Sequence, residues 1–431
     1  MTVTLVVFIV DAFISFLKYN TVTQISADNK NRIDFPAVTI CNMNMVKKSI
    51  IHCNNTAFVG LDTLFVNFGE TLVIEDRLTD ELDVIFGKIP NGEEMLHCVR
   101  EYSNTVQEML PICTWKGRLE PCQNLFITTL TEMGVCFTFN GEGNQRLQTS
   151  YSGSDGGLGV FIDIQQANYF YSSTIQAGIK VVLHEPGEAP LPSLGGFLVA
   201  PGLSAEAVIS RTRKKFLNEP YGSCLNIKEV GNPLHRYAFY SEKACRMECM
   251  IDYLVSADEH CRNCRYFLYP GNASANDFTS NCKCKRPCSM YEYKTSISYA
   301  RIMSDFMSTY FVTEGVFLSS IYTKSGSNEN IFSSLFRDNF IELKIYYDSL
   351  IETAVTEVPE FNIFEMLSDI GGLMGIFLGA SLLSLVELLE FFILLLRPRN
   401  KLKTVEVPAL ENGAMSHEAG DGTETHSSVL K

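Results

Sequence analysis

Near its C-terminus the chain contains a long apolar run, which constrains the fold more than any other feature. Residues 371–396 are twenty-six residues with only two charged side chains, Glu387 and Glu390. A helix of this length rises roughly 39 Å, more than the bilayer's hydrocarbon core of about 30 Å. We therefore predict a pore-lining transmembrane helix within residues 363–396. Four Lys and Arg residues follow directly, so the tail 397–431 is expected to be cytoplasmic, and its small polar residues predict disorder.

Residues 1–18 form a second apolar segment, in which Asp11 is the one charged residue before Lys18. A signal peptide is the alternative interpretation, but this segment lacks the basic start and the small-residue cleavage site of signal peptides. We interpret it as the first transmembrane helix, extending N-terminal to residue 1. With both termini cytoplasmic, the chain is predicted to be a multi-pass protein of the plasma membrane.

The middle of the chain has the composition of an extracellular domain. All fourteen cysteines lie between residues 41 and 288, which is typical of an oxidising compartment. N-glycosylation acceptors occur in the same interval, at Asn54 and Asn272. We therefore assign residues 19–362 to one extracellular domain. The net charge of −14 argues against a nucleic-acid partner and favours cations.

Four stretches of this domain have the composition of β-strands: 34–41, 160–164, 178–184 and 340–347. In the last stretch apolar and polar residues alternate, which predicts a strand with one buried face. Residues 241–255 have the composition of a helix. The predicted fold class is therefore α+β, with a sheet at its centre.

Two pairs of cysteines have matching spacings. Cys245 and Cys249 are four residues apart in the predicted helix, so their Cβ atoms share one face roughly 5–6 Å apart. Cys282 and Cys284 are two residues apart, and in an extended strand they share a face about 6.6 Å apart. These spacings predict that the helix and the strand are joined by Cys245–Cys284 and Cys249–Cys282.

Cys224–Cys288 would be the next bridge of the same series. The alternative is a zinc ribbon, in which Cys261 and Cys264 bind the metal together with the 282/284 pair. The second pair of such a ribbon would have a shorter spacing than is usual for zinc. An oxidising compartment therefore favours disulfides over zinc.

Six short motifs occur in order along the chain: 35–42 (FPAVTICN), 136–140 (CFTFN), 177–181 (AGIKV), 200–202 (APG), the cysteine series 245–288, and 379–381 (GAS). Together they resemble the degenerin/epithelial sodium channel family, which includes acid-sensing and peptide-gated members. The resemblance covers residues 19–397. It implies a homo- or heterotrimeric, sodium-preferring channel blocked by amiloride, with two transmembrane helices and an extracellular palm, finger and thumb. No cofactor is implied, and Na⁺ is the permeant ion.

The resemblance also implies further disulfides and supports the three bridges above. The additional implied pairs are Cys41–Cys136 and Cys113–Cys122, which leave Cys53–Cys98 and Cys261–Cys264 as the remaining pairs. The thumb loop 265–281 contains no cysteine, unlike that of acid-sensing channels. The thumb is therefore expected to be shorter and bridged differently.

The pore residues follow from the same resemblance. Gly379, Ala380 and Ser381 match the selectivity filter, where small residues leave backbone carbonyls facing the axis; packing of small residues between helices is the alternative. A carboxylate facing lipid costs at least about 2.5–3.5 kcal/mol. Glu387 and Glu390 are therefore expected to face the pore. The alternative is that they are solvated near the cytoplasmic interface, more so for Glu390.

Three gating features are implied as well. Ser368 matches the position outside the pore where bulky residues hold family channels open, and an N-cap is its alternative role. Asp369 beside it is assigned to the same gating region, and Gly371 and Gly372 resemble the region of amiloride block.

Tyr19 and Tyr221 match an aromatic pair that couples the thumb to the first transmembrane helix. Tyr221 replaces a tryptophan, which predicts less extensive stacking. Two independent surface tyrosines are the alternative interpretation.

The opening stimulus is less well defined. Asn20 and Thr21 occupy the place of a histidine pair in proton-gated relatives, and neither titrates near neutral pH. Glu188 matches one finger acid, Gly187 replaces the other, and the thumb acid Asp277 has no clear match. We therefore predict weak or absent proton gating, with an extracellular peptide ligand or constitutive opening as the two options.

A non-conducting, cysteine-rich receptor or accessory subunit is the competing hypothesis, but it gives no reason for two glutamates in an apolar helix. No nucleophile motif or metal-ligand set is evident, which argues against an enzyme and a metal site. His184, beside a predicted strand, is expected to be structural.

Overall fold

The computed structural model describes residues 2–52, 92–142, 146–170, 176–258, 282–304, 334, 336–378 and 382–396. The chain divides into two compact units, one formed by residues 1–14 with 363–431 and the other by residues 15–362.

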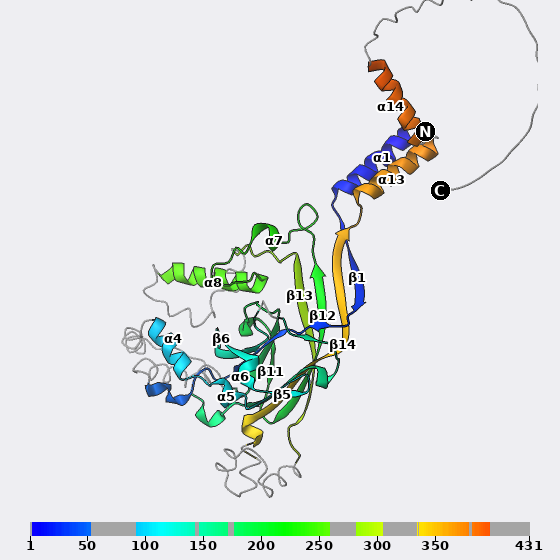
Figure 1. Ribbon diagram of the computed structural model, residues 1–431. Helices are drawn as coiled ribbons and strands as arrows, with labels where there is room; N and C mark the ends of the chain where they lie inside the picture. Colours follow the sequence, from blue (N-terminus) through cyan, green and yellow to red (C-terminus); the bar gives the residue numbers. More distant parts are fainter. Residues whose placement is uncertain are drawn as a thin grey trace, which may run out of the picture. The chain divides into compact units, whose positions relative to one another are not determined.

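The described residues of the first unit form α13 (Ile363–Leu378), α14 (Leu382–Leu396) and most of α1 (Thr2–Leu17). Helices α1 and α13 lie side by side, and the rings of Phe8 and Phe377 are 6.1 Å apart (Figure 1). The apolar run predicted as one helix is thus described as two, α13 and α14. Within the described residues, no single helix combines the length and the apolar character that a membrane crossing requires.

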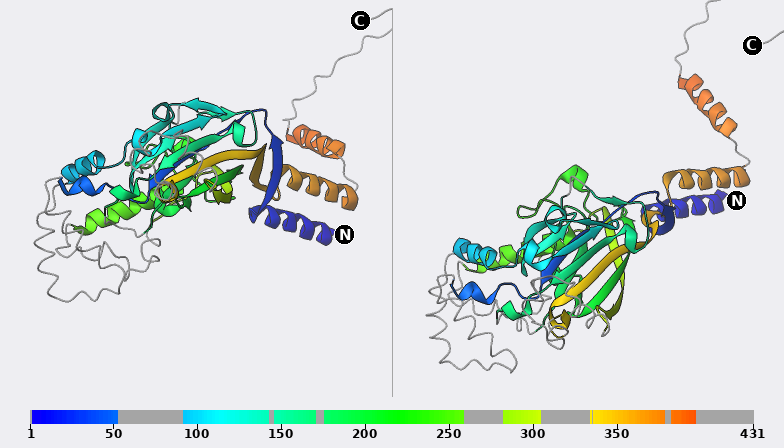
Figure 2. Two further views of the ribbon diagram at one scale, coloured as in Figure 1. Left: turned by 90° about the horizontal axis from the view of Figure 1, so that it is seen from below. Right: turned by 60° about the horizontal axis from the view of Figure 1, so that its bottom comes forward.

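The second unit contains a large sheet of seven strands. Its strand order is β13-β12-β14-β9-β4-β5, and β1 pairs with β14. The strands are β1 (Thr21–Asn29), β4 (Ile112–Trp115), β5 (Arg118–Glu120), β9 (Leu158–Asp163), β12 (Leu203–Lys215), β13 (Ser289–Arg301) and β14 (Phe340–Pro359). The 20-residue β14 runs through the middle of this sheet (Figure 2).

A second sheet of five strands has the order β11-β10-β3-β7-β6. Its strands are β3 (Ala37–Asn42), β6 (Phe126–Thr131), β7 (Gly134–Phe139), β10 (Ile179–His184) and β11 (Phe197–Val199). A short pair, β2 (Ile33–Asp34) and β8 (Gln148–Thr149), completes the described strands.

The described helices of this unit are α4 (Gly92–Glu101), α5 (Val106–Met109), α6 (Cys122–Leu125), α7 (Ile227–Val230) and α8 (Glu242–Asp258). Short 3₁₀ turns are η1 (Lys48–His52), η2 (Ser154–Gly156), η3 (Gln166–Asn168) and η4 (Pro192–Leu194).

One hydrophobic core draws its side chains from both large sheets. Phe35, which precedes β3, is fully buried and contacts three aromatic rings edge to face: Trp115, Phe139 and Tyr347, at centroid distances of 4.9, 5.9 and 5.8 Å. Edge-to-face pairs stabilise beyond the area they bury. Phe35, the first residue of the motif 35–42, therefore helps to pack the two sheets against each other.

The strand and helix predictions are confirmed. Each predicted strand corresponds to an observed one, β3, β9, β10 and β14, and the predicted helix 241–255 is α8. Residues 341, 343, 345 and 347 of β14 are buried, as their alternation predicted, while the residues between them are half-buried. Strand β14 continues twelve residues beyond the predicted end.

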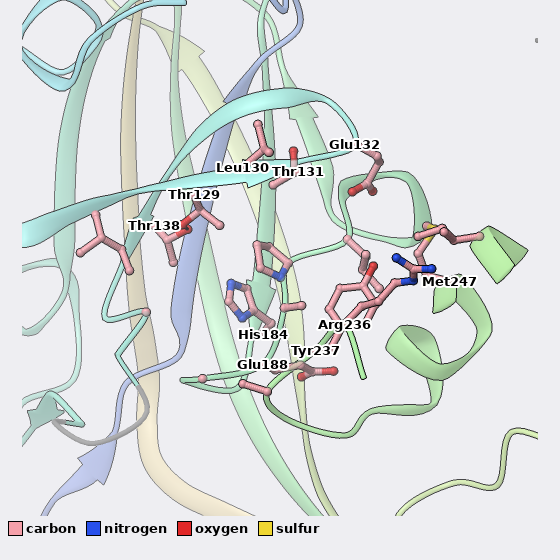
Figure 3. Close-up of a pocket in the computed structure, with 18 residues that line it drawn as sticks. Thr129, Leu130, Thr131, Glu132, Thr138, His184, Glu188, Arg236, Tyr237 and Met247 are labelled. Atoms are coloured by element: carbon pink, nitrogen blue, oxygen red, sulfur yellow. Dashed lines mark hydrogen bonds between the residues drawn. The ribbon is translucent and has the colours of Figure 1, made fainter. Parts of the chain in front are cut away.

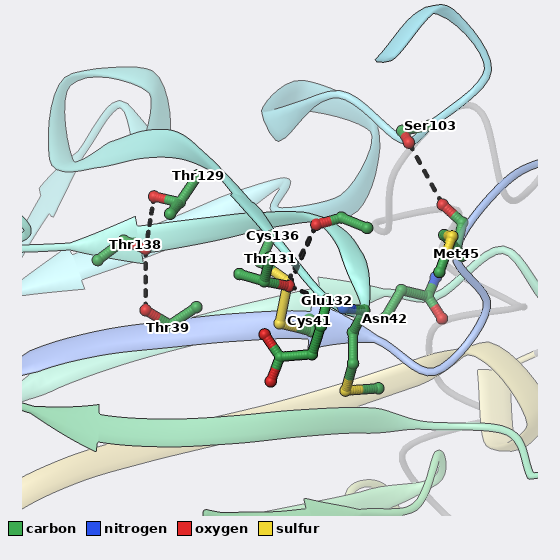
Figure 4. Close-up of a disulfide and its surroundings, with 12 residues drawn as sticks. Thr39, Cys41, Asn42, Met45, Ser103, Thr129, Thr131, Glu132, Cys136 and Thr138 are labelled. Atoms are coloured by element: carbon green, nitrogen blue, oxygen red, sulfur yellow. Dashed lines mark hydrogen bonds between the residues drawn. A yellow bond between two sulfur atoms is a disulfide. The ribbon is translucent and has the colours of Figure 1, made fainter. Parts of the chain in front are cut away.

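Five predicted disulfides are present. The Cys41–Cys136 bridge joins directly opposite residues of β3 and β7, with a Cα–Cα distance of 4.5 Å (Figure 4). That distance is typical of a non-hydrogen-bonded antiparallel pair, in which side chains approach most closely. Cys113–Cys122 joins β4 to α6.

The bridges Cys245–Cys284 and Cys249–Cys282 attach α8 to the segment that precedes β13, and Cys224–Cys288 lies at the start of β13. Because Cys282 and Cys284 are both oxidised, the zinc ribbon that would use their thiolates is excluded. Cys98 is also disulfide-bonded. Its predicted partner Cys53, the pair Cys261–Cys264 and both glycosylation sites, Asn54 and Asn272, lie outside the described residues.

Two motif glycines have left-handed backbones, Gly178 with φ +141° and Gly202 with φ +79°. A Cβ at Gly202 would lie 2.7 Å from the carbonyl oxygen of Arg337, and one at Gly178 would clash with the carbonyl of Val199. Both positions need glycine because conformation and space exclude a side chain there.

Candidate functional site

Helix α13 carries the four residues assigned to gating and amiloride block. Ser368 and Asp369 are exposed, and they lie inside the helix, which begins at Ile363. The alternative N-cap role of Ser368 is therefore wrong, because an N-cap precedes the first helical turn. Gly371 and Gly372 are exposed, and a Cβ at either would meet no atom within 4 Å among the described residues.

Helix α14 carries the two predicted pore acids. Glu387 and Glu390 are exposed in the single chain. Three residues apart in a helix, they lie on one face. The predicted filter residues Gly379, Ala380 and Ser381 lie outside the described residues, as does the thumb acid Asp277.

The structure brings together Tyr19 and Tyr221, which are about 200 residues apart in the sequence. Their rings meet edge to face, with centroids 5.2 Å apart and an interplanar angle of 89°. They are therefore not independent surface residues. Tyr19 follows the end of α1 with a left-handed φ of 52°, a conformation that disfavours residues other than glycine.

A cavity of about 550 Å³ lies between β6, the loop after β10, and α8 (Figure 3). Its walls include Glu132, Glu188, Arg236, Tyr237 and Met247. The polar groups are already engaged: Glu132 accepts hydrogen bonds from the Ser193 amide and hydroxyl, both at 2.8 Å. The guanidinium of Arg236 donates to Asp252 at 2.8 Å. The cavity thus combines an apolar wall with fixed charges.

Glu188, which the resemblance matches to a finger acid, lines this cavity. Burial raises the pKa of its carboxyl group, although hydrogen bonds from the Ser241 side chain and the Glu185 amide oppose the shift. Gly187 beside it contributes no carboxylate. The second finger acid of proton-gated relatives therefore has no counterpart at that position.

His184 lies beside the same cavity and is buried. Its Nε2 atom is 2.8 Å from the Thr39 hydroxyl, and its Nδ1 atom is 3.2 Å from the Glu185 carbonyl. Burial lowers its pKa to about 4. The ring is therefore neutral at physiological pH and has the structural role predicted for it.

A charge cluster beside the large sheet was missed by the sequence analysis; it consists of Asp34 of β2, Arg211 and Arg213 of β12, and Glu352 of β14. Arg211 pairs with Asp34 at 3.4 Å and with Glu352 at 3.5 Å, and its guanidinium stacks on the Tyr291 ring at 3.8 Å. Arg213 of β12 contacts Glu352 at 3.5 Å. Arg211 and Glu352 are both 4% exposed, so each charge requires its partner.

One signal could have revealed this cluster. Arg211 and Arg213 alternate within a β-like stretch, so they share a face, and Glu352 interrupts the other long strand. Charged residues at strand positions with a buried face indicate buried ion pairs. The pairing of the two strands was needed to recognise them as partners.

Comparison with known proteins gives consistent matches along the chain. The pattern of the amiloride-sensitive sodium channel family matches residues 1–391. Acid-sensing ion channel 2 of Rattus norvegicus is 29% identical over 420 residues, which are 89% of this chain and 77% of the relative. Acid-sensing ion channel 1 of Gallus gallus is 30% identical over 410 residues, 87% of this chain and 73% of the relative.

Among solved structures, a cryo-EM structure of a proton-activated chloride channel aligns over 91% of this chain and 94% of its own. The TM-score is 0.32 at 6% sequence identity, which carries no argument about fold or function.

Proposed function

The chain belongs to the amiloride-sensitive sodium channel family, and from this we propose that it is one subunit of a trimeric, amiloride-blocked, sodium-preferring cation channel. Channels of this family are sodium channels rather than enzymes, and they assemble as homo- or heterotrimers in the plasma membrane. The observation that carries the proposal is the pair of carboxylates, Glu387 and Glu390, on one face of an otherwise apolar helix.

We propose that α1 is the first transmembrane segment and that α13 and α14, with residues 379–381 between them, form the second. A 16-residue helix rises roughly 24 Å, less than a hydrocarbon core of about 30 Å, so α13 requires the residues that follow it. Placing a Gly-Ala-Ser sequence between two helices at membrane depth would turn its carbonyls toward a water-filled axis. Three copies would then surround the permeant Na⁺ ion.

In this arrangement the exposed faces of α13 and α14 would line the pore. Around a three-fold axis, six carboxylates from Glu387 and Glu390 would attract cations. The open space at Gly371 and Gly372 would serve amiloride block, and Ser368 with Asp369 would lie at the outer gate.

The test is to express the full-length protein in oocytes and record sodium current with and without amiloride. Because a bulky side chain at the outer gate would prevent closure, Ser368→Phe is expected to give a standing, amiloride-blocked current several times that of the parent. Ser368→Ala is the matched control, because it stays small and should leave the current unchanged. Absence of current in Ser368→Phe, with surface protein confirmed by biotinylation, would support the non-conducting receptor instead.

For gating, we propose an extracellular ligand, with a peptide as the candidate, and weak or no activation by protons. Glu188 is half-buried and hydrogen-bonded, Gly187 adds no carboxylate beside it, and the neighbouring carboxylate of Glu185 is paired with Arg146. The cavity beside Glu188 is large enough for one or two side chains of a ligand and offers them an apolar wall with fixed charges. Constitutive opening is the second option, and the same recordings separate the two.

A further inference from the structure

One loop carries Tyr221 to its contact with Tyr19, and its two ends are tied to the same neighbouring segment. This base loop comprises residues 216–224 and follows β12 directly. At its start, the Phe216 amide donates to the Cys288 carbonyl at 2.8 Å. At its end, Cys224 is bonded to Cys288 by a disulfide. Both ends of the loop are therefore anchored at Cys288, and other contacts position its tip.

Glu357 of β14 makes one of these contacts. Its Oε2 atom accepts a hydrogen bond from the Leu217 amide at 3.2 Å, and its Oε1 atom lies 3.8 Å from the Arg286 guanidinium. The side chain of Glu357 is 20% exposed and that of Arg286 is 48% exposed, so solvent screens this pair in part.

Arg286 continues the connection to the base loop. Its guanidinium lies over the Phe216 ring, with Cζ 4.1 Å from the centroid, and its carbonyl accepts from the Leu225 amide at 2.8 Å. A planar guanidinium can stack on a ring and pair with a carboxylate at once, which a lysine cannot do equally well. Arg286 thus links Glu357 to the loop on both sides of the tip.

Glu357 lies close to the point where the sheet connects to helix α13. In the β1–β14 pair, Glu357 lies opposite Thr23, two residues before β14 ends at Pro359. Tyr19 lies two residues before β1 begins. The base loop therefore contacts the same strand pair twice, through a ring at the start of β1 and through a carboxylate near the end of β14. From Pro359 the chain continues into α13, which begins at Ile363.

We infer that Glu357 and Arg286 are positioning residues for gating: they hold the base loop so that Tyr221 meets Tyr19. This inference rests on the proposed channel function, because the movement that the contact would transmit is opening of the pore. It assigns two charged residues and Phe216 to the coupling, in addition to the tyrosine pair.

The position of Tyr221 can be measured without current. Trp115 is the single tryptophan, so Trp115→Phe with Tyr221→Trp places the only indole at the contact. In this purified full-length double variant, Glu357→Ala and Arg286→Ala are expected to raise acrylamide quenching of the indole at least about twofold, because a released loop exposes the ring. Arg286→Lys keeps the charge without the planar stack and should give an intermediate value.

Lys285→Ala is the matched control. Lys285 neighbours Arg286 and pairs with Glu219 of the same loop at 3.3 Å. The two cations are similarly exposed, but Glu219 is 78% exposed whereas Glu357 is 20% exposed. Such a pair contributes little, so quenching should not change. Unchanged quenching in both Glu357→Ala and Arg286→Ala, or an equal rise in Lys285→Ala, would overturn the inference.

Current provides the second readout, in Ser368→Phe channels at equal surface expression. Glu357→Ala is expected to change the amiloride-sensitive standing current, and to have little further effect when Tyr221→Ala is already present. Strictly additive effects, or no effect of Glu357→Ala alone, would show that Glu357 does not act through Tyr221. If Ser368→Phe itself carries no current, the channel proposal fails, and the quenching experiment still decides the role of Glu357.

Discussion

At the scale of single residues, His184 shows how burial determines the behaviour of a titratable side chain. The Glu185 carbonyl can only accept, so Nδ1 carries the proton and Nε2 accepts from the Thr39 hydroxyl. Hydroxyl contacts continue from Thr39 to Thr138 at 2.9 Å and to Thr129 at 2.8 Å (Figure 4). Protonation of Nε2 would turn this atom from an acceptor into a donor, so the Thr39 hydroxyl could no longer donate to it.

The pH dependence of stability follows from this histidine. Its folded pKa of about 4 lies below an unfolded value of about 6.5, so the unfolded state binds the proton first and stability is lost as pH falls between these values. Acidification from pH 7 to pH 5 should cost about 2 kcal/mol through this residue. His184→Gln should remove that part of the loss, measured as the change in thermal midpoint of the purified protein at the two pH values.

The comparison between parent and variant is needed because Glu188 acts in the opposite direction. Its raised pKa lets the folded state keep a proton that the unfolded state releases, so its contribution to stability grows on acidification. That contribution is common to both proteins. An equal loss in parent and His184→Gln would show that His184 is not the responsible group.

At the scale of elements, the parallel pairing of β12 and β14 contains a marked irregularity. Ile209 pairs with Tyr347, whereas Arg211 pairs with Glu352, so residues 348–351 of β14 lie opposite the single residue Ser210. Directly after this shift, Arg211 and Glu352 pair as buried charges. The ion pair thus reinforces the register where the ladder of backbone hydrogen bonds is interrupted.

Removing one member of this pair should therefore be costly. Arg211→Met leaves Glu352 and Asp34 with less positive charge in a buried site and is expected to destabilise the fold by about 3–5 kcal/mol. Arg211→Met combined with Glu352→Leu should recover part of this loss, because the uncompensated charge is gone. Thermal midpoints and surface expression measure both effects.

Lys214→Met provides the control on the same strand. Lys214 pairs with Glu292 at 2.7 Å, but both side chains are partly exposed, so its removal should cost less than about 1 kcal/mol. A double variant that is as unstable as the sum of its single changes would contradict the role of the buried pair.

At the scale of the whole molecule, the cavity and the sheet account for the expected weakness of the acid response. Acid sensing requires carboxylates that face one another without cations, since proximity then raises their pKa. Here residue 187 offers Glu188 no carboxylate, and its other neighbour Glu185 is paired with Arg146. The acids of the charge cluster are likewise paired with Arg211 and Arg213.

A step from pH 7.4 to about 5, near where raised carboxylate pKa values lie, is therefore expected to evoke no large transient current in oocytes that express the full-length protein. Replacing Gly187 with Asp, which would give Glu188 a second neighbouring carboxylate besides Glu185, is the variant most expected to introduce such a current. The left-handed φ of +91° at Gly187 disfavours a side chain, so surface expression is the necessary control. A large transient current in the unmodified channel would refute the prediction.

Much of the fold was accessible from local patterns. Alternation in 340–347 predicted the buried face of β14, and the spacings of Cys245, Cys249, Cys282 and Cys284 predicted two bridges. Motif resemblance supplied the family and the bridges Cys41–Cys136 and Cys113–Cys122. The local pattern did not predict where β14 ends, because that boundary depends on the strands that pair with it. Strand β14 extends to Pro359 because β1 and β12 pair with its second half.

The amino-acid order alone was sufficient for the family, the cysteine bridges between α8 and its partner segment, and the proposal of two pore acids, because each depends on spacing within a short stretch or on a motif. Tertiary structure was required for contacts between residues far apart in the chain. It alone joined Tyr19 to Tyr221, Arg211 to Glu352, and Glu357 to the base loop, since strand pairing and loop closure decide which side chains meet. The apolar run near the C-terminus thus indicates a channel, and the contacts within the folded unit of residues 15–362 carry the proposals for how that channel would be opened.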